Sequence, residues 1–527
     1  MRPSRPHTHT YAASKLFQTT LPRLLSESLE GAGERRLVVD GSRVLTRAEI
    51  AAAAARIQES LRERGVRPGD VVVAQLPNWW ETVAVTVAVW GMGAVLNLVT
   101  PIYRRREMSE IIRALSPRLA IAPLTYRGHD HYSVIKDVVD DEGIDCDVTT
   151  LRSEEANDHS LVTSWTDPVH DLEVVDSVDN VALVMFTSGT TGRPKGVLHS
   201  QRTLLYEASS IGQRFVRAGD PVFMPSPLGH ITGLLFGVLL PVLTDGEVVL
   251  MDRWDASQAV ALIEQNQCTF SVGATPFLSG LVQEYASLDR RSSLRWFVCG
   301  GADIPGPLVT RARSVMGTSV ARAYGLTEMP TLCCGAPSDP VDRLDATEGR
   351  VVGEAAARLG SAVGTAHELE IHGPELFLGY LDPADNTAAF TDDGWFRTGD
   401  LATIDEGYVT IVGRSKDVIV RGGENIGAKE IEDLACELDS VSEAAVVGVP
   451  DDELGERACI FVRTDAEAPT LETVTAHLDE RGLAKQKWPE YLIVIDRLPR
   501  TVSGKVQKFM LREQAQDQLA KISRRPA

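Results

Sequence analysis

Short apolar runs alternate along the chain with longer segments in which apolar residues recur at helical spacing. Residues 45–64 follow the helical pattern and predict an amphipathic helix. A turn with glycine and proline follows at 65–70, and the apolar run 71–76 predicts a buried strand. Similar runs predict strands at 119–123, 181–186, 222–225, 247–251, 270–274 and 296–299. Short strands between longer helices predict an α/β fold with largely parallel sheets.

One uncharged stretch, residues 82–103, is long enough to suggest a membrane-spanning helix. Gly91 and Gly93 interrupt it, however, and it contains several threonines, an asparagine and a proline. We therefore expect a buried helix through Trp90, a turn, and a strand at 94–99, with no stable membrane insertion.

The pattern changes after Gly413. The remaining residues have their own predicted strands at 444–449, 458–462 and 491–495, with helices between them, and a unit of this size can fold alone. We place the boundary there, which gives an N-terminal domain of residues 1–413 and a C-terminal domain of residues 414–527.

Composition and charge narrow the classes of partner. Hydrophobic residues make up 43% and charged residues 24%, a balance typical of globular proteins. The net charge is -20, from 53 basic and 73 acidic residues, and such a surface repels nucleic acid phosphates and anionic lipids. The seven cysteines contain no CxxC pair, and residues 1–20 lack the apolar segment of a secretory signal. These features predict free thiols and a cytoplasmic protein that binds no nucleic acid.

The strongest chemical signal is the segment 187–197, which follows a predicted buried strand. Its hydroxyl, glycine and lysine residues include Thr187, Ser188, Gly189, Thr190, Thr191, Gly192 and Lys195. Small residues let backbone N–H groups approach an anion closely, and the lysine adds positive charge, so we predict a phosphate-binding loop. Its spacing excludes a Walker A loop. The alternative is an ordinary turn between strands.

This segment resembles the signature loop of the adenylate-forming (ANL) superfamily, which includes acyl-CoA synthetases, aryl-CoA ligases, luciferases and peptide-synthetase adenylation domains. Further motifs follow in the family's order: CGGAD at 299–303, YGLTE at 324–328, GWFRTGD at 394–400, GRSKD at 413–417, RGGENI at 421–426 and PRTVSGK at 499–505. The resemblance extends from about residue 45 to residue 508. Each motif is weak alone, but their common order makes coincidence a poor explanation.

The resemblance implies an AMP-forming acyl-CoA synthetase. Such an enzyme uses ATP to convert a carboxylic acid into acyl-AMP, then transfers the acyl group to coenzyme A and releases AMP and pyrophosphate. It implies a large N-terminal α/β domain with parallel-rich sheets, which binds ATP and the acid, and a small mobile C-terminal α+β domain with the catalytic lysine. The alternative is transfer to a carrier-protein thiol, and a homodimer is left open.

The resemblance also assigns roles that fit the chemistry of the residues. Glu328 beside Thr327 is the kind of hard carboxylate that Mg²⁺ on a triphosphate takes, and Thr327 would contact the α-phosphate. Lys505 would neutralise the anions that meet during adenylation. Tyr324 would stack on adenine, and Asp400 beside Arg414 would bind the ribose. The remaining nucleotide- and CoA-binding residues are Gly300, Gly301, Ala302, Gly325, Lys416, Gly422 and Gly423.

Taken singly, these residues have ordinary alternatives. Glu328 could be a charge at a helix start, Asp400 a turn residue, and Lys505 a solvated surface lysine. The shared motif order favours the catalytic interpretation.

The acid-binding site is less defined. Residues 227–233 resemble the family segment whose histidine, here His230, gates the acyl site, with Gly325 nearby. No acidic residue occurs between Phe223 and Thr244, which argues against an amino acid substrate because the α-amine would lack a partner. Glycines among apolar residues favour an apolar cavity. The resemblance implies a fatty, alicyclic or aromatic acid of small to medium size, whereas the alternative for His230 is a structural role.

Overall fold

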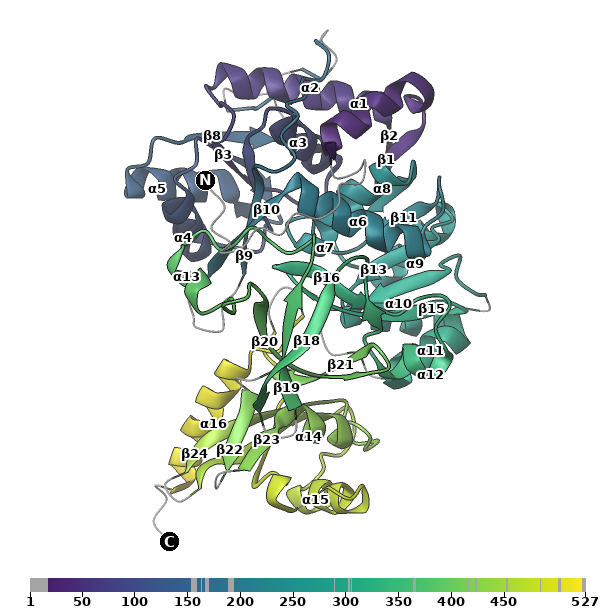
Figure 1. Ribbon diagram of the computed structural model, residues 1–527, viewed down its shortest axis with the longest axis vertical. Helices are drawn as coiled ribbons and strands as arrows, with labels where there is room; N and C mark the ends of the chain where they lie inside the picture. Colours follow the sequence, from purple (N-terminus) through teal and green to yellow (C-terminus); the bar gives the residue numbers. More distant parts are fainter. Residues whose placement is uncertain are drawn as a thin grey trace.

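The computed structural model describes residues 18–152, 159–162, 164–165, 170–187, 194–288, 290–301, 304, 306–363, 366–414, 417–421, 424–451, 454–483, 485–500 and 504–523. These residues form an α/β protein with a thirteen-stranded, a six-stranded and a five-stranded sheet and a two-stranded ribbon of β6 (Thr125–Tyr126) and β7 (His129–Asp130). Figure 1 shows the five-stranded sheet and its helices gathered at one end of the molecule.

The six-stranded sheet has the order β10-β9-β4-β3-β5-β8. Its strands are β3 (Val71–Gln75), β4 (Val95–Val99), β5 (Leu119–Pro123), β8 (Asp147–Leu151), β9 (Val181–Thr187) and β10 (Lys195–Ser200). All pairs are parallel except β9 with β10. Every residue of β3, β4 and β5 is buried, which explains why these strands appear in the sequence as continuous apolar runs.

The thirteen-stranded sheet is half parallel and half antiparallel. Its parallel half contains β1 (Arg36–Asp40), β11 (Pro221–Met224), β12 (Glu247–Leu250), β13 (Phe270–Gly273), β14 (Trp296–Cys299) and β15 (Ser319–Leu326), with β2 (Arg43–Thr46) antiparallel at the edge. Its antiparallel half continues through β16 (Met329–Cys334), β17 (Arg350–Val351), β21 (Tyr408–Arg414), β20 (Phe396–Asp405), β19 (Ala366–His372) and β18 (Ala356–Val363). The apolar pattern predicted β11, β12, β13 and β14 of the parallel half, but neither its remaining strands nor the antiparallel half.

Helices pack in layers around the two large sheets. Those of the N-terminal part are α1 (Leu21–Ala32), α2 (Arg47–Glu63), α3 (Trp80–Gly91), α4 (Arg105–Leu115), α5 (His131–Glu142), α6 (Gln201–Phe215), α7 (Ile231–Leu234), the π-helix η2 (Leu235–Leu239), α8 (Leu240–Leu243), α9 (Ala256–Gln265), α10 (Thr275–Ala286), α11 (Gly306–Met316), α12 (Val341–Ala346) and α13 (Ala384–Thr387). Helices α1–α3, α6 and α8, with η2, share one core between the sheets, α4 and α5 cover the outer face of the six-stranded sheet, and α9–α11 cover the outer face of the other.

Local sequence explains two predicted helices. Helix α2 begins after Thr46, whose side chain and that of Glu49 form a reciprocal capping box. Helix α3 is buried along its whole length and is followed, after a short turn, by β4, as expected for residues 82–103. Within the described part of the chain, no helix has both the length and the apolar character needed to cross a membrane.

The C-terminal sheet has its own two cores. It contains β22 (Val418–Arg421), β23 (Glu424–Gly427), β24 (Glu443–Asp451), β25 (Gly455–Arg463) and β26 (Tyr491–Val494). Alternate residues of β24 and β25 pack on α14 (Ala428–Ala435) and α15 (Leu471–Glu480) or on α16 (Lys508–Ser523), because successive strand residues face opposite sides. A short 3₁₀ helix, η4 (Lys485–Lys487), precedes β26. The boundary near Gly413 stays a prediction.

Candidate active site

The predicted site residues come from several strands, from the segments next to them, and from one loop of the C-terminal part. Tyr324 and Gly325 lie near the end of β15, and Thr327 and Glu328 form the two-residue turn to β16. The strands approach so closely here that a Cβ on Gly325 would lie 1.9 Å from the Pro330 carbonyl oxygen. Only glycine fits at this position. The close pairing of the two strands fixes the position of the turn, and with it Thr327 and Glu328.

Asp400 lies inside β20 and is not a turn residue, the alternative that its sequence allowed. It is directly opposite Arg414 of β21, whose Nε lies 2.8 Å from Asp400 Oδ1. The Tyr324 hydroxyl donates a 2.5 Å hydrogen bond to Asp400 Oδ2. Burial, and then the Asp400 charge, raise the pKa of Tyr324 well above its ordinary value. Asp400 is thus a buried carboxylate, 2% exposed, with one donor on each oxygen among the described residues and a further lone pair on each for a ligand hydroxyl.

Glu328 is also buried, at 9% exposure, and its Oε1 accepts a 2.7 Å hydrogen bond from the Tyr380 hydroxyl. The Lys195 ammonium lies 4.7 Å from the centre of the Tyr380 ring. His199 Nε2 donates a 2.7 Å hydrogen bond to the Thr327 carbonyl oxygen, which ties β10 to the turn. The predicted Lys195 and Glu328 are therefore joined through a residue, Tyr380, that the motifs did not single out.

Lys505 lies where the C-terminal part meets these strands. Burial, and then Arg414, lower the pKa of Lys505, while the carboxylates of Asp400 and Glu328 act in the opposite direction. The loop before it is closed by a 2.7 Å hydrogen bond from Arg500 Nη1 to the Gly504 carbonyl oxygen. Lys505 therefore faces charged groups of two other segments.

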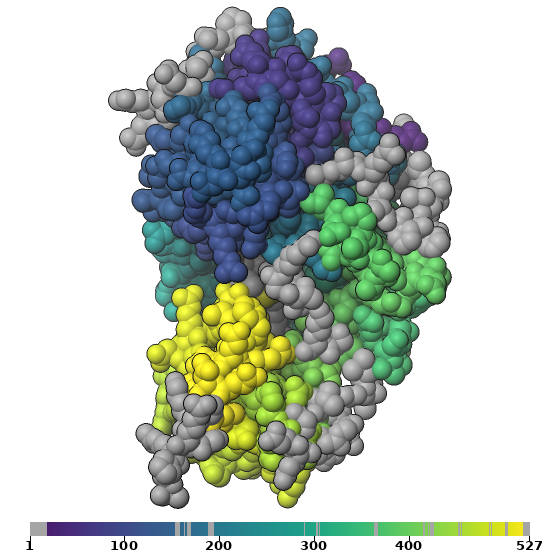
Figure 2. All heavy atoms as spheres, turned by 90° about the vertical axis from the view of Figure 1, so that its left-hand side faces the viewer, coloured from purple at the N-terminus to yellow at the C-terminus, as the bar shows by residue number. Residues whose placement is uncertain are grey.

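The backbone of this loop touches the N-terminal part directly. Gly504 has a φ of +86°, and a Cβ there would lie 3.7 Å from Pro276 in α10. In Figure 2 the yellow C-terminal residues form the lower end of the molecule, below the blue N-terminal residues.

His230 immediately precedes α7. Its Nε2 is buried and has no hydrogen-bond partner within the described residues. Burial, and then the charge of Lys505, lower its pKa to about 4, so the imidazole is neutral near pH 7. The preceding Gly229 packs on the backbone of Val99 and Thr100, with room for no side chain. His230 thus brings a neutral ring close to Lys505.

The remaining predicted residues divide into two groups. Thr187 and Lys195 face each other across β9 and β10, Gly300 packs against the Ala323 carbonyl oxygen, and Gly301 has a φ of +78° that favours glycine. Ser188, Gly189, Thr190, Thr191, Gly192, Ala302, Lys416, Gly422 and Gly423 lie outside the described residues, and their roles stay predictions.

The site residues fit a nucleotide that brings its own metal ion. Within the described ranges, no group of three or more His, Cys, Asp or Glu residues could hold a metal ion. Mg²⁺ that arrives on a triphosphate needs only one or two carboxylates, since phosphate oxygens and water supply the other ligands. Glu328, a buried carboxylate whose Oε2 has no hydrogen-bond donor among the described residues, fits that requirement.

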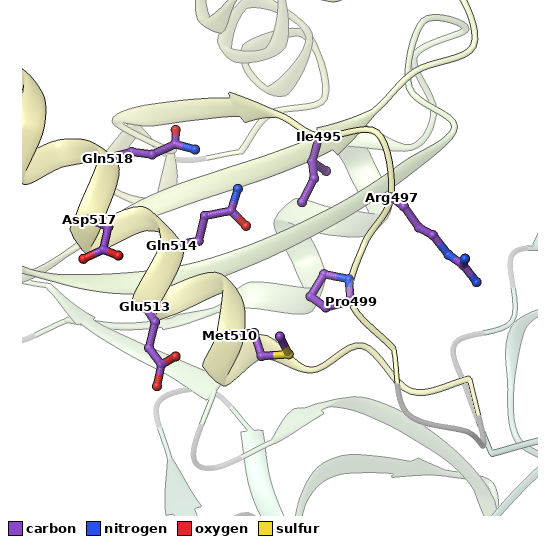
Figure 3. Close-up of a pocket in the computed structure, with 8 residues that line it drawn as sticks. All are labelled: Ile495, Arg497, Pro499, Met510, Glu513, Gln514, Asp517 and Gln518. Atoms are coloured by element: carbon purple, nitrogen blue, oxygen red, sulfur yellow. The ribbon is translucent and has the colours of Figure 1, made fainter. Parts of the chain in front are cut away.

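A shallow groove of 460 Å³ lies elsewhere, on the C-terminal part, between α16 and the segment after β26 (Figure 3). It is lined by Ile495, Arg497, Pro499, Met510, Glu513, Gln514, Asp517 and Gln518. None of the predicted site residues lines it, so this groove is separate from the candidate site.

Known proteins are similar to this chain in both sequence and fold. The family described as AMP-binding enzyme matches residues 25–381, and the AMP-binding enzyme C-terminal domain matches residues 430–505. The medium-chain fatty-acid–CoA ligase of Escherichia coli (strain K12) is 35% identical over 488 residues, 88% of this chain and 84% of that protein. The 2-hydroxy-7-methoxy-5-methyl-1-naphthoate–CoA ligase of Streptomyces carzinostaticus is 33% identical over 523 residues, 93% of this chain and 92% of that protein.

The crystal structure of ATP-bound MatB from Rhodopseudomonas palustris superposes with a TM-score of 0.85 at 27% identity, covering 94% of this chain and 99% of that one. The apo crystal structure of the same protein gives a TM-score of 0.75. The backbone of this chain is therefore more similar to the ATP-bound form of MatB than to its apo form.

Proposed function

Because the chain belongs to the AMP-binding enzyme family and is an AMP-forming acid–CoA ligase, we propose that Lys505, Glu328 and Asp400 carry out its first half-reaction. In that reaction a carboxylate oxygen attacks the α-phosphorus of ATP, the bond to the β-phosphate oxygen breaks, and pyrophosphate leaves. The observation that supports this assignment is that Lys505, from the C-terminal part, lies among the charges of Asp400, Glu328 and Arg414.

Each residue has a separate task in adenylation. Asp400 would accept the ribose hydroxyls on its remaining lone pairs, beside Arg414 and the Tyr324 hydroxyl. Lys505 would place its ammonium between the attacking carboxylate and the phosphate, where it offsets the repulsion between two anions. Thr327 would donate its hydroxyl to the α-phosphate. Gly300 and Gly301 would let the backbone come close to the adenine.

Glu328 would hold Mg²⁺, which, when bound, draws negative charge from the triphosphate oxygens. Thr187, Lys195 and the loop between them would hold the phosphates from the other side, since Lys195 is at the start of β10 and follows that loop. The β- and γ-phosphates would then lie between two protein segments.

The second half-reaction needs a different arrangement. The CoA thiol attacks the acyl carbonyl, the bond to AMP breaks, and AMP leaves, so Lys505 is no longer required at the phosphate. We propose that the C-terminal domain turns about Lys416 and brings Gly422 and Gly423 to the pantetheine path.

The proposed substrate class is a carboxylic acid with an apolar body of small to medium size. The ligase of E. coli named above acts on medium-chain fatty acids and that of S. carzinostaticus on a naphthoate. In this chain His230 is neutral and all apolar side chains of η2 are buried, so neither supplies a charge that would pair with an amine or a second carboxylate. Such surroundings favour an alkyl or aryl group.

ATP–pyrophosphate exchange across a panel of carboxylic acids tests the proposal. Medium-chain fatty acids and aromatic acids should support exchange, and amino acids should not. AMP and pyrophosphate should form, and formation of ADP and phosphate would refute the mechanism. Free CoA and a carrier-protein thiol should be compared as acyl acceptors, and the thioester should form faster with CoA.

A further inference from the structure

Tyr380 belongs to a segment that links the two sheets of the site. The Leu378 and Leu381 N–H groups donate 2.7 Å hydrogen bonds to carbonyl oxygens of β10, at Leu198 and Gly196. The Phe377 N–H donates a 2.8 Å hydrogen bond to the Glu328 carbonyl oxygen. Residues 376–381 are therefore fixed both to the strand that follows the phosphate loop and to the turn that carries Glu328.

The Tyr380 side chain contacts residues of the same two parts of the site. It is 5% exposed, its hydroxyl donates to Glu328 Oε1 at 2.7 Å, and its ring lies 4.7 Å from Lys195 Nζ. Asp385 Oδ1 lies 3.3 Å from the same ammonium and holds it from a second direction. One buried side chain thus contacts the two residues proposed to hold opposite sides of the triphosphate.

Both contacts restrict groups that would otherwise move. A glutamate in a two-residue turn can rotate about its side-chain bonds, but a hydrogen bond to one oxygen selects one rotamer. Carboxylates that bind metals are commonly oriented by such a donor. An ammonium that lies over an aromatic ring is likewise attracted to the ring face, and the attraction is stronger where the pair is buried.

We propose that Tyr380 is a positioning residue for adenylation: its hydroxyl turns Glu328 so that Oε2 alone faces the metal-bound triphosphate, and its ring holds Lys195 opposite. The proposal rests on the proposed function of Glu328 and Lys195. It adds that Glu328 binds the metal through one oxygen, and that Tyr380 acts through its neighbours without touching the reacting atoms.

The test begins with Tyr380→Phe, which removes the hydroxyl and keeps the ring. Calorimetric titration with ATP should show binding weakened by about 10-fold to 100-fold at saturating Mg²⁺, the scale of one hydrogen bond to a charged group. In the absence of Mg²⁺ the wild-type and variant affinities should agree. The KM for the carboxylic acid should not change, because Glu328 and Lys195, which Tyr380 contacts, are proposed to hold the triphosphate and not the acid.

Tyr408→Phe is a matched control. Tyr408 is also buried, and its hydroxyl donates a 3.1 Å hydrogen bond to Asp339 Oδ1, away from the proposed site residues. It should leave Mg²⁺-dependent ATP binding unchanged. Thioester formation from synthetic acyl-adenylate and CoA reports that each variant is folded, and Tyr380→Phe should retain it.

A double-mutant cycle separates positioning from a general structural role. If Tyr380 acts through Glu328, adding Tyr380→Phe to Glu328→Gln should change Mg²⁺-dependent ATP binding by less than about threefold, since coupled sites are not additive. Full additivity, or unchanged binding in Tyr380→Phe alone, would overturn the positioning role. If Glu328→Gln itself leaves Mg²⁺-dependent binding unchanged, the proposed function of Glu328 is what fails.

Discussion

Replacing Lys505 by alanine should separate the two half-reactions. The substitution removes an ammonium that lies close enough to Asp400, Glu328 and Arg414 for their charges to act on its pKa. At a separation of about 4 Å and an effective dielectric constant of about 20, one ion pair contributes ~4 kcal/mol. Removal of a single electrostatic donor in other enzymes costs about 10²–10³-fold in kcat. We therefore expect acid-dependent ATP–pyrophosphate exchange to fall by about 10²–10³-fold.

Synthetic acyl-adenylate with CoA provides the second assay. Since Lys505 leaves the site before thiol attack in the proposed mechanism, Lys505→Ala should keep most of the thioester rate. The variant should also remain folded. Burial lowers the pKa of Lys505, so the folded state binds this proton less tightly than the unfolded state. Below the folded pKa the lysine thus lowers stability, and alanine removes that cost.

Lys508→Ala is the matched control. Lys508 lies three residues away but forms a 2.8 Å ion pair with Glu432 inside the C-terminal part, so its loss should spare exchange. If Lys505→Ala lowers the rates of both half-reactions equally, the proposal that Lys505 leaves the site between the two steps is refuted. Normal exchange in Lys505→Ala, with loss in Lys508→Ala, would transfer the catalytic charge to Lys508.

Four further outcomes follow from the site. In the pH profile of the free wild-type enzyme, kcat/KM for ATP should fall as the pH rises through the pKa of Lys505, which is lowered from the 10.5 of an ordinary lysine. The profile of Lys505→Ala should lack this decrease. Glu328→Gln should cost about 2–4 kcal/mol in kcat/KM, measured by exchange over a Mg²⁺ series, and unchanged Mg²⁺ dependence would contradict it. Gly325→Ala, with a Cβ 1.9 Å from the Pro330 oxygen, should lower the free energy of unfolding by about 1–3 kcal/mol in urea, whereas Gly31→Ala in α1, with open space around it, should not. Lys416→Pro, which fixes φ near about -65°, should block thioester formation while sparing exchange, and normal overall turnover would remove Lys416 from the hinge role.

The chemistry of the site could be proposed from sequence because the groups expected to act on ATP belong to local motifs. Thr327 and Glu328 are adjacent, and Lys505 follows a glycine in a loop, so residue types and order were informative. The structure places Tyr324, Asp400, Arg414, Glu328 and Lys505 near one another, as the motif order led us to expect. Tyr380 and His199 had no comparable signal: their partners are 52 and 128 residues away in the sequence.

The strands show the same division. Strands β3 and β5 are buried on both faces and β14 is nearly so, and their sequences are therefore almost continuous apolar runs that were predicted within a residue. Strand β20, by contrast, contains an arginine, two threonines and two aspartates, and its buried positions are mixed with exposed ones, so nothing local distinguishes it from a loop. It is a strand because it pairs with β19 and β21. The sequence alone determined which segments must be buried and which residues are proposed to bind phosphate, metal and ribose. The tertiary structure decided which segments pair, and therefore that Tyr324 and Arg414 meet on Asp400, because such hydrogen bonds form only after distant parts of the chain have packed together.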